Sequence, residues 1–127
     1  EVSGPGLDLV LDGSLSALDL QDLINELRNA GAEAIALNGH RLVLDSAAVT
    51  GNEGQLVMDG QVVTRPFEFQ AIGDPQTLES ALLRPGGLLS IQRRSYPNLK
   101  VRVTQRTHLV LATYRSQIDF QYAERVD

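Results

Sequence analysis

The residues with the most chemical character form a basic stretch in the last third of the chain. Residues 84–115 contain seven basic side chains and no acidic one. Five of them are candidates for contact with an anionic polymer, lipid head groups or an acidic protein, with Tyr96 and Tyr114 interleaved: Arg93, Arg94, Lys100, Arg102 and Arg106. Alternatively, Lys100 and Arg102 lie on the polar side of an edge strand, where charge blocks edge-to-edge aggregation. The net charge of −5 and the lack of a recognised motif argue against a nucleic-acid partner.

Residues suited to catalysis or metal binding are sparse. The chain has no cysteine, which excludes disulfides, thiolate zinc sites and cysteine nucleophiles. His40 and His108 have no carboxylate at a helical ligand spacing, and His40 is expected to be exposed because it follows a predicted turn. No Gly-x-Ser-x-Gly elbow occurs. We therefore expect no enzyme, no metal and no cofactor.

Asn38 and Arg41 are weaker candidates for a partner-binding loop. Asn38-Gly39 accepts positive φ at both central positions of a type I′ turn, so it predicts a tight hairpin between residues 34–37 and 41–44. The structural interpretation is that the dipeptide only sets the turn and that Arg41 is a surface residue at a polar strand edge. Replacing Gly39 by Val distinguishes the two: it should destabilise the domain if the turn is tight, and leave the melting temperature unchanged if no tight turn is present.

The elements that must position these residues follow from hydrophobic periodicity. Alternating leucines predict a strand over 7–12 and a helix follows over 20–30, with Asp19 as its N-cap and Gly31 after its end. Asp59-Gly60 predicts a second hairpin, and residues 46–54 are expected to be a loop. The remaining expectations are a strand over 67–72, a helix begun by Asp74-Pro75, a short helix over 88–92, and strands over 99–104, 109–111 and 118–122.

This order predicts an α+β fold, a ferredoxin-like split βαβ sandwich with two main helices on one face of a mixed sheet and extra hairpin strands. The 127 residues fit a single globular domain. No apolar run reaches the length of a membrane-spanning helix.

Several segments resemble one bacterial family. They are Gly4-Pro5-Gly6 before a strand, residues 22–28, residues 31–41 with Gly-Ala-Glu-Ala-Ile and Asn-Gly, residues 71–75 with Leu78, Pro85-Gly86-Gly87, and residues 112–115 leading to 120–123. Together they span nearly the whole chain. The chain is thereby similar to the YlxW/YlxX-like "division initiation protein" family of unknown function.

The resemblance implies a membrane helix and a coiled coil ahead of this domain, which would then lie on the extracytoplasmic side of the cell membrane. It implies no reaction and no catalytic residues. Our first hypothesis is a non-catalytic interaction domain of a membrane-anchored envelope protein, with the link to cell division that the family label suggests and a protein partner whose identity is unknown. The alternative is a binding domain for a small anionic ligand or cell-wall polymer through the Arg84–Arg115 stretch. A homodimer would form along the strand near Lys100–Thr104 or the C-terminal strand, since strand edges invite pairing.

Overall fold

The first strand, β1 (Val2–Asp12), lies inside the main sheet of the protein. The computed structural model describes residues 1–112 of the chain. Leu7, Leu9 and Leu11 are fully buried on one side of β1, as their alternation predicts. The strand begins earlier than predicted, so Gly4-Pro5-Gly6 lies within it. At Gly6 a Cβ atom would lie 2.0 Å from the carbonyl oxygen of Ala71, so the neighbouring strand requires glycine there.

The main sheet has five strands in the order β3-β2-β7-β1-β8. They are β2 (Ala34–Leu37), β3 (His40–Arg41), β7 (Phe67–Ile72) and β8 (Lys100–Leu111) beside β1. Every neighbouring pair is antiparallel, so the prediction of a mixed sheet is wrong. The two strands predicted over 99–104 and 109–111 are one continuous strand, β8. The strand predicted over 118–122 lies outside the described residues.

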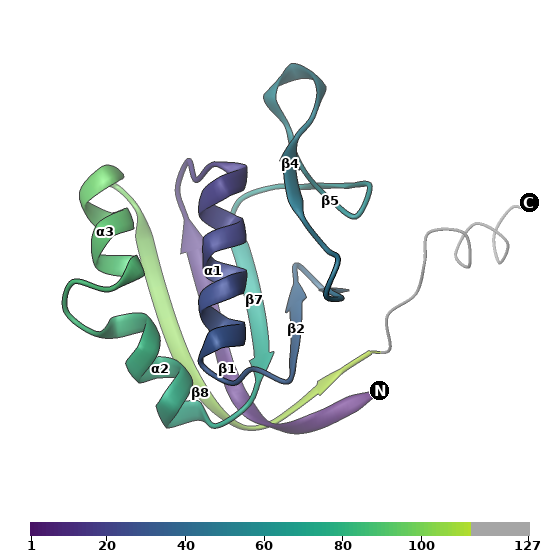
Figure 1. Cartoon of the computed structure of the whole chain (residues 1–127), viewed down its shortest axis with the longest axis vertical. Helices are drawn as coiled ribbons and strands as arrows, with labels where there is room; N and C mark the ends of the chain where they lie inside the picture. Colours follow the sequence, from purple (N-terminus) through teal and green to yellow (C-terminus); the bar gives the residue numbers. More distant parts are fainter. Residues whose placement is uncertain (113–127) are drawn as a thin grey trace, which may run out of the picture.

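Three helices pack on this sheet: α1 (Ala17–Asn29), α2 (Pro75–Leu83) and α3 (Leu88–Ser95). Figure 1 shows α1 along β1 and β7, with α2 and α3 beside β8. α1 begins three residues earlier than predicted because Ser16, and not Asp19, is the N-cap, and Asp19 completes a capping box as the third helical residue. Asp74 caps α2 as predicted. The α+β class is confirmed.

One core joins the helices to the sheet. Its buried side chains come from every layer: Leu7, Leu9, Leu11, Leu20, Leu23, Ile24, Leu27, Ile35, Leu37, Phe67, Phe69, Leu78, Leu82 and Leu89. The opposite face of the sheet carries no helix in residues 1–112 and holds a smaller apolar cluster of Ala34, Ala36, Ile72, Leu109 and Leu111. We call this the open face.

A second sheet stands beside the first, formed by β4 (Ala48–Thr50), β5 (Leu56–Met58) and β6 (Gln61–Val63). The expected loop over 46–54 is therefore wrong, since it contains β4 and the 3-10 turn η1 (Asn52–Gly54). Both predicted tight turns are confirmed. Asn38 and Gly39 have φ of 49° and 83°, and Asp59 and Gly60 have φ of 52° and 81°.

Candidate functional site

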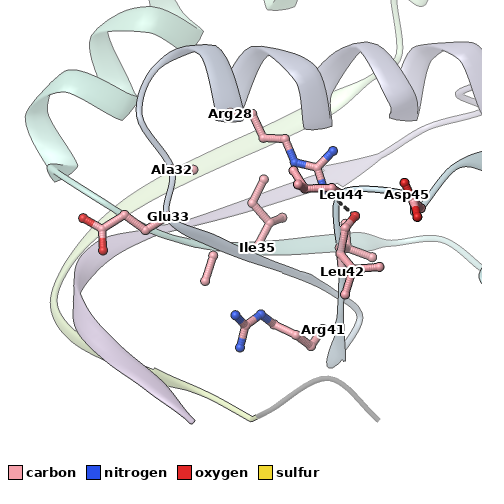
Figure 2. A pocket seen from close by; sticks show the side chains of 10 residues that line it. Arg28, Ala32, Glu33, Ile35, Arg41, Leu42, Leu44 and Asp45 are labelled. Carbon is pink, nitrogen blue, oxygen red and sulfur yellow. Dashed lines mark hydrogen bonds between the residues drawn. The ribbon is translucent and has the colours of Figure 1, made fainter. Parts of the chain in front are cut away.

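A hollow lies where α1 ends, beside the outer edge of β2. It has a volume of about 630 Å³ and we call it the edge groove (Figure 2). The groove lies between the last turn of α1, β2 and the segment that follows β3. Ten residues line it: Arg28, Ala32, Glu33, Ala34, Ile35, Arg41, Leu42, Val43, Leu44 and Asp45.

The groove exists because β3 is only two residues long. The Asn38-Gly39 turn returns the chain alongside β2, and the last backbone bond of this pairing is from the Leu42 amide to the Ile35 carbonyl at 2.9 Å. The chain then leaves the sheet. Nη2 of Arg28 donates to the Val43 carbonyl at 2.7 Å, so the end of α1 holds the departing segment in place.

Two arginines approach β2 from its two faces. Arg41 lies opposite Ala36, whose side chain belongs to the open face, whereas Arg28 comes from the helix layer. Figure 2 shows the two guanidinium groups on opposite sides of the β2 ribbon. Nη1 of Arg41 donates to the Ala112 carbonyl at 2.9 Å, while its Nε is buried with no hydrogen-bond partner among the described residues. Arg41 thus has intermediate exposure at the strand edge, where its side chain also contacts the residue that follows β8.

The walls and the rim of the groove differ in character. Leu42 is buried in the main core, but Leu44, two residues further, is 86% exposed. Glu33 and Asp45 are exposed at the rim. A molecule bound in the groove would therefore contact the exposed Leu44 side chain and the partly buried guanidinium groups of Arg28 and Arg41.

Asn38 serves the turn itself. Its Nδ2 donates to the Thr64 carbonyl at 3.0 Å, and its Oδ1 accepts from the Glu68 amide at 2.7 Å. These bonds occupy both ends of the amide within the fold, which favours the structural interpretation of Asn38.

His40 is not exposed as expected, because its ring packs against the turn of the second sheet. Nε2 of His40 lies 3.0 Å from Oδ2 of Asp59, and the two side chains are 17% and 16% exposed. The buried Ser46 hydroxyl donates to the same carboxylate oxygen at 2.5 Å and accepts from the Val43 amide. The Asp59 carboxylate lies between Ser46 and His40, so the Ser46 hydroxyl contacts a carboxylate and not the imidazole. Serine catalysis requires a hydrogen bond between the serine hydroxyl and the histidine ring, which this arrangement lacks.

The five predicted basic residues do not gather at one place. Arg93 and Arg94 are exposed on α3, in the helix layer. Val101 and Val103 pack against the main core, so Lys100 and Arg102 extend from the other side of β8, onto the open face. Lys100 and Arg102 line a hollow of about 370 Å³ together with Val10, Asp12, Pro66 and Val101.

Arg106 and the two tyrosines complete the prediction. Nη1 of Arg106 lies 2.6 Å from Oδ2 of Asp8 in an ion pair on the open face. The Tyr96 hydroxyl donates to Asp19 at 2.5 Å, and this bond raises the pKa of Tyr96. Burial opposes ionisation of Asp19, but bonds from Tyr96 and Ser16 prevail and lower the pKa of its carboxyl. Tyr114 lies outside the described residues.

Residues 1–112 contain no group of three or more potential metal ligands. None of the helices described there is long and apolar enough to cross a bilayer. Arg28 and Leu44 were missed by the sequence analysis. They form the groove only through the packing of α1 against a segment fifteen residues away, which periodicity does not show.

The fold and the groove define an α+β domain with an antiparallel sheet covered by helices on one face and a partly basic hollow at its edge. The family described as "Bacterial protein of unknown function (DUF881)" matches residues 1–124. The chain belongs to this family, which is the YlxW-like family that its motifs resemble.

UPF0749 proteins of other bacteria are similar to the chain in sequence. The chain is 35% identical over 130 residues to the UPF0749 protein Rv1825 of Mycobacterium tuberculosis, covering 98% of this chain and 44% of the relative. It is 42% identical over 67 residues to the UPF0749 protein YlxW of Bacillus subtilis, covering 53% of this chain and 29% of the relative. The chain thus spans under half the length of these relatives.

A solved structure shares the fold. The crystal structure of an uncharacterized conserved protein from Mycobacterium tuberculosis matches with a TM-score of 0.75 and 32% identity. The match covers 91% of this chain and 87% of that one.

Proposed function

We propose that this domain is a non-catalytic interaction module, and that the edge groove is its contact surface. The observation that carries the proposal is Leu44, which is 86% exposed beside two half-buried arginines. Arginine is enriched at protein interfaces, and burial of an exposed apolar side chain favours association. The groove contains no acid–base pair or nucleophile with a base in contact, which favours binding over catalysis.

We also propose a location for the full-length protein and a ferredoxin-like topology for this domain. We place the domain in a longer, membrane-anchored envelope protein on the extracytoplasmic side, with a role near cell division; the family resemblance and the greater length of the relatives support this. A ferredoxin-like split βαβ arrangement is supported by the order β2-β7-β1-β8, in which α1 connects β1 to β2 and the pair α2 and α3 connects β7 to β8.

Site-specific photo-crosslinking tests the contact surface. A photoreactive amino acid replaces Leu44 in the full-length protein in its own bacterium, and a second strain carries it at Leu18, which is 69% exposed on α1 outside the groove. We expect a discrete crosslinked protein from position 44 that is lost when Arg41→Gln is added. Equal products from both positions, or a product from position 44 that persists with Arg41→Gln, contradict the groove as the contact surface.

Binding of an anionic ligand is a second candidate, favoured by one observation. Lys100 and Arg102 flank the hollow on the open face and make no ion pair within residues 1–112. Retention on an anionic polymer that falls with salt and is lost in Lys100→Gln with Arg102→Gln, but kept in Arg93→Gln with Arg94→Gln, would support this candidate.

A further inference from the structure

We infer that the edge groove binds an extended polypeptide segment of a partner protein, one that adds to the sheet edge and alternates acidic with apolar side chains. The inference rests on the proposed function and adds the chemistry of the partner to it. Three features of the groove carry it: a short outer strand, arginines on the two faces of the edge, and an exposed leucine.

The first feature is the incomplete sheet edge. β3 ends the main sheet on this side in residues 1–112, and it pairs with β2 only at Ala36 and Leu37. One further bond, from the Leu42 amide to Ile35, closes this pairing, and the chain then departs. Strand addition at an exposed sheet edge obtains affinity from main-chain hydrogen bonds and specificity from alternate side chains.

The second feature is the placement of the side chains across that edge. Successive residues of an added strand point to opposite faces of the sheet. On the open face they meet the guanidinium group of Arg41, and on the helix side they meet Arg28 and the segment carrying Leu44. A small anion cannot contact two guanidinium groups held on opposite faces of one strand. A polypeptide with alternating side chains can use both faces.

The third feature is the distribution of charge. The acidic residues of the groove, Glu33 and Asp45, are exposed at its rim, and they form no ion pair with Arg28 or Arg41. Arg41 forms no ion pair with a described carboxylate, and its buried Nε has no described partner, so an acidic side chain on this face would meet a positive charge that the fold leaves uncompensated. Acidic side chains facing Arg41 and apolar ones facing Leu44 are the chemistry that fits.

A set of capped synthetic peptides tests this inference against the whole chain by fluorescence anisotropy at about 0.15 M salt. The probe alternates valine and aspartate over seven residues. One control replaces every aspartate by asparagine, and a second methylates alternate backbone nitrogens on the pairing side. The protein variants are Arg41→Gln, Leu44→Ser and, as a matched control outside the groove, Arg93→Gln.

We expect the alternating probe to bind and both control peptides to bind at least about tenfold more weakly. Arg41→Gln should weaken the probe by about tenfold or more, as loss of a charge-assisted bond does, while Arg93→Gln leaves it unchanged. Leu44→Ser should weaken it by several-fold. Because Leu44 is highly exposed, this variant should keep the wild-type melting temperature and thus separates binding from folding.

Three results overturn the inference: no saturable binding of the probe, equal binding of the N-methylated peptide, or a concentration-dependent dimer that Arg41→Gln dissociates. The second result would indicate a plain anion site, and the third a second copy of the chain in the groove. If the peptides do not bind but position 44 still gives a crosslink that depends on Arg41, strand addition is rejected and the proposed function is kept. Failure of both would reject the two together.

Discussion

The hydroxyl of Tyr96 ties the end of α3 to the beginning of α1 through one carboxylate. Asp19 accepts from the Ser16 amide at 2.9 Å and from Tyr96 at 2.5 Å, so a single side chain both caps α1 and receives a long-range bond. A hydrogen bond to a charged group contributes more than a neutral one. The contact therefore joins helix capping to the packing of two helices.

Tyr96→Phe is expected to lower the free energy of unfolding by about 1–2 kcal/mol at neutral pH. Asp19 has a lowered folded-state pKa, so its contribution is present above the unfolded pKa near 3.8 and is lost as the pH falls through the folded value. Urea unfolding of both proteins should therefore show a difference that is constant between about pH 5 and 9 and shrinks below about pH 4. A difference that stays constant down to pH 2 would contradict a role for the ionised carboxylate.

Gly39→Val is expected to cost about 1–3 kcal/mol of unfolding free energy, measured by thermal melts. Gly39 has φ of +83° and a Cβ there would meet nothing within 4 Å, so the cost is backbone strain alone. Gly39→Asn is the matched control and should cost less, since asparagine tolerates the left-handed region. Equal melting of Gly39→Val and the parent would show that the turn is not tight.

At the scale of elements, β1 and β7 approach so closely that one position excludes every side chain. Gly6→Ala would place Cβ 2.0 Å from the Ala71 carbonyl oxygen, a backbone atom that cannot move without shifting β7. We expect a loss of about 3 kcal/mol or more in urea unfolding. Gly54→Ala, in an exposed turn with open space around it, should cost about 1 kcal/mol from its positive φ alone. Similar losses in the two variants would mean that β7 yields easily.

The second sheet is fastened to the first by the Asp59 carboxylate, which contacts both Ser46 and His40. Ser46→Ala removes the acceptor of the Val43 amide and a donor to Asp59, so it should destabilise the protein by about 1–3 kcal/mol. Ser46→Ala and Asp59→Asn should not be additive in a double-mutant cycle, because they share one contact. Additive losses would show that the two residues stabilise their elements independently.

Over the whole molecule, opposite charges from distant parts of the chain meet on the surface. Arg106 pairs with Asp8, and Arg84 lies 3.9 Å from Glu26, so basic residues of the last third face acidic residues of the first. Exposed pairs of this kind contribute little. Arg106→Gln should therefore change the unfolding free energy by less than about 1 kcal/mol, and 1 M NaCl should reduce that change. A large, salt-resistant loss would contradict this.

Elements whose sequence signal is local were predictable, and those that depend on distant residues were not. Asn38-Gly39 and Asp59-Gly60 set their turns by their own φ requirements, and Asp74-Pro75 starts α2 by its own capping chemistry. The continuity of β8 was missed because residues 104–108 are polar and exposed on both faces, without the alternation that predicts a strand. β4 was missed because three residues are too few to show a period.

The candidate site was predicted in part for the same reason. Arg41 stands next to a recognisable turn, so the sequence singled it out. Arg28 and Leu44 become neighbours only when α1 packs against the segment after β3, and the exposure of Leu44 is visible only in the fold. The basic residues share one stretch of the sequence, but Arg93 and Arg94 lie on α3 in the helix layer, whereas those of β8 alternate with core valines and so extend onto the open face.

The pairing of β1 with β8 has a mechanical consequence. Val2 lies opposite Leu111, and the two strands run antiparallel from there to Asp12 and Lys100 (Figure 1). A force that pulls Val2 away from Leu111 acts at one end of the paired strands, so the hydrogen bonds between β1 and β8 break one pair at a time and do not share the load. Traction applied at these two points would peel β8 from the sheet at low force, whereas traction between Val2 and Lys100 would pull along the strands and meet the resistance of the whole ladder.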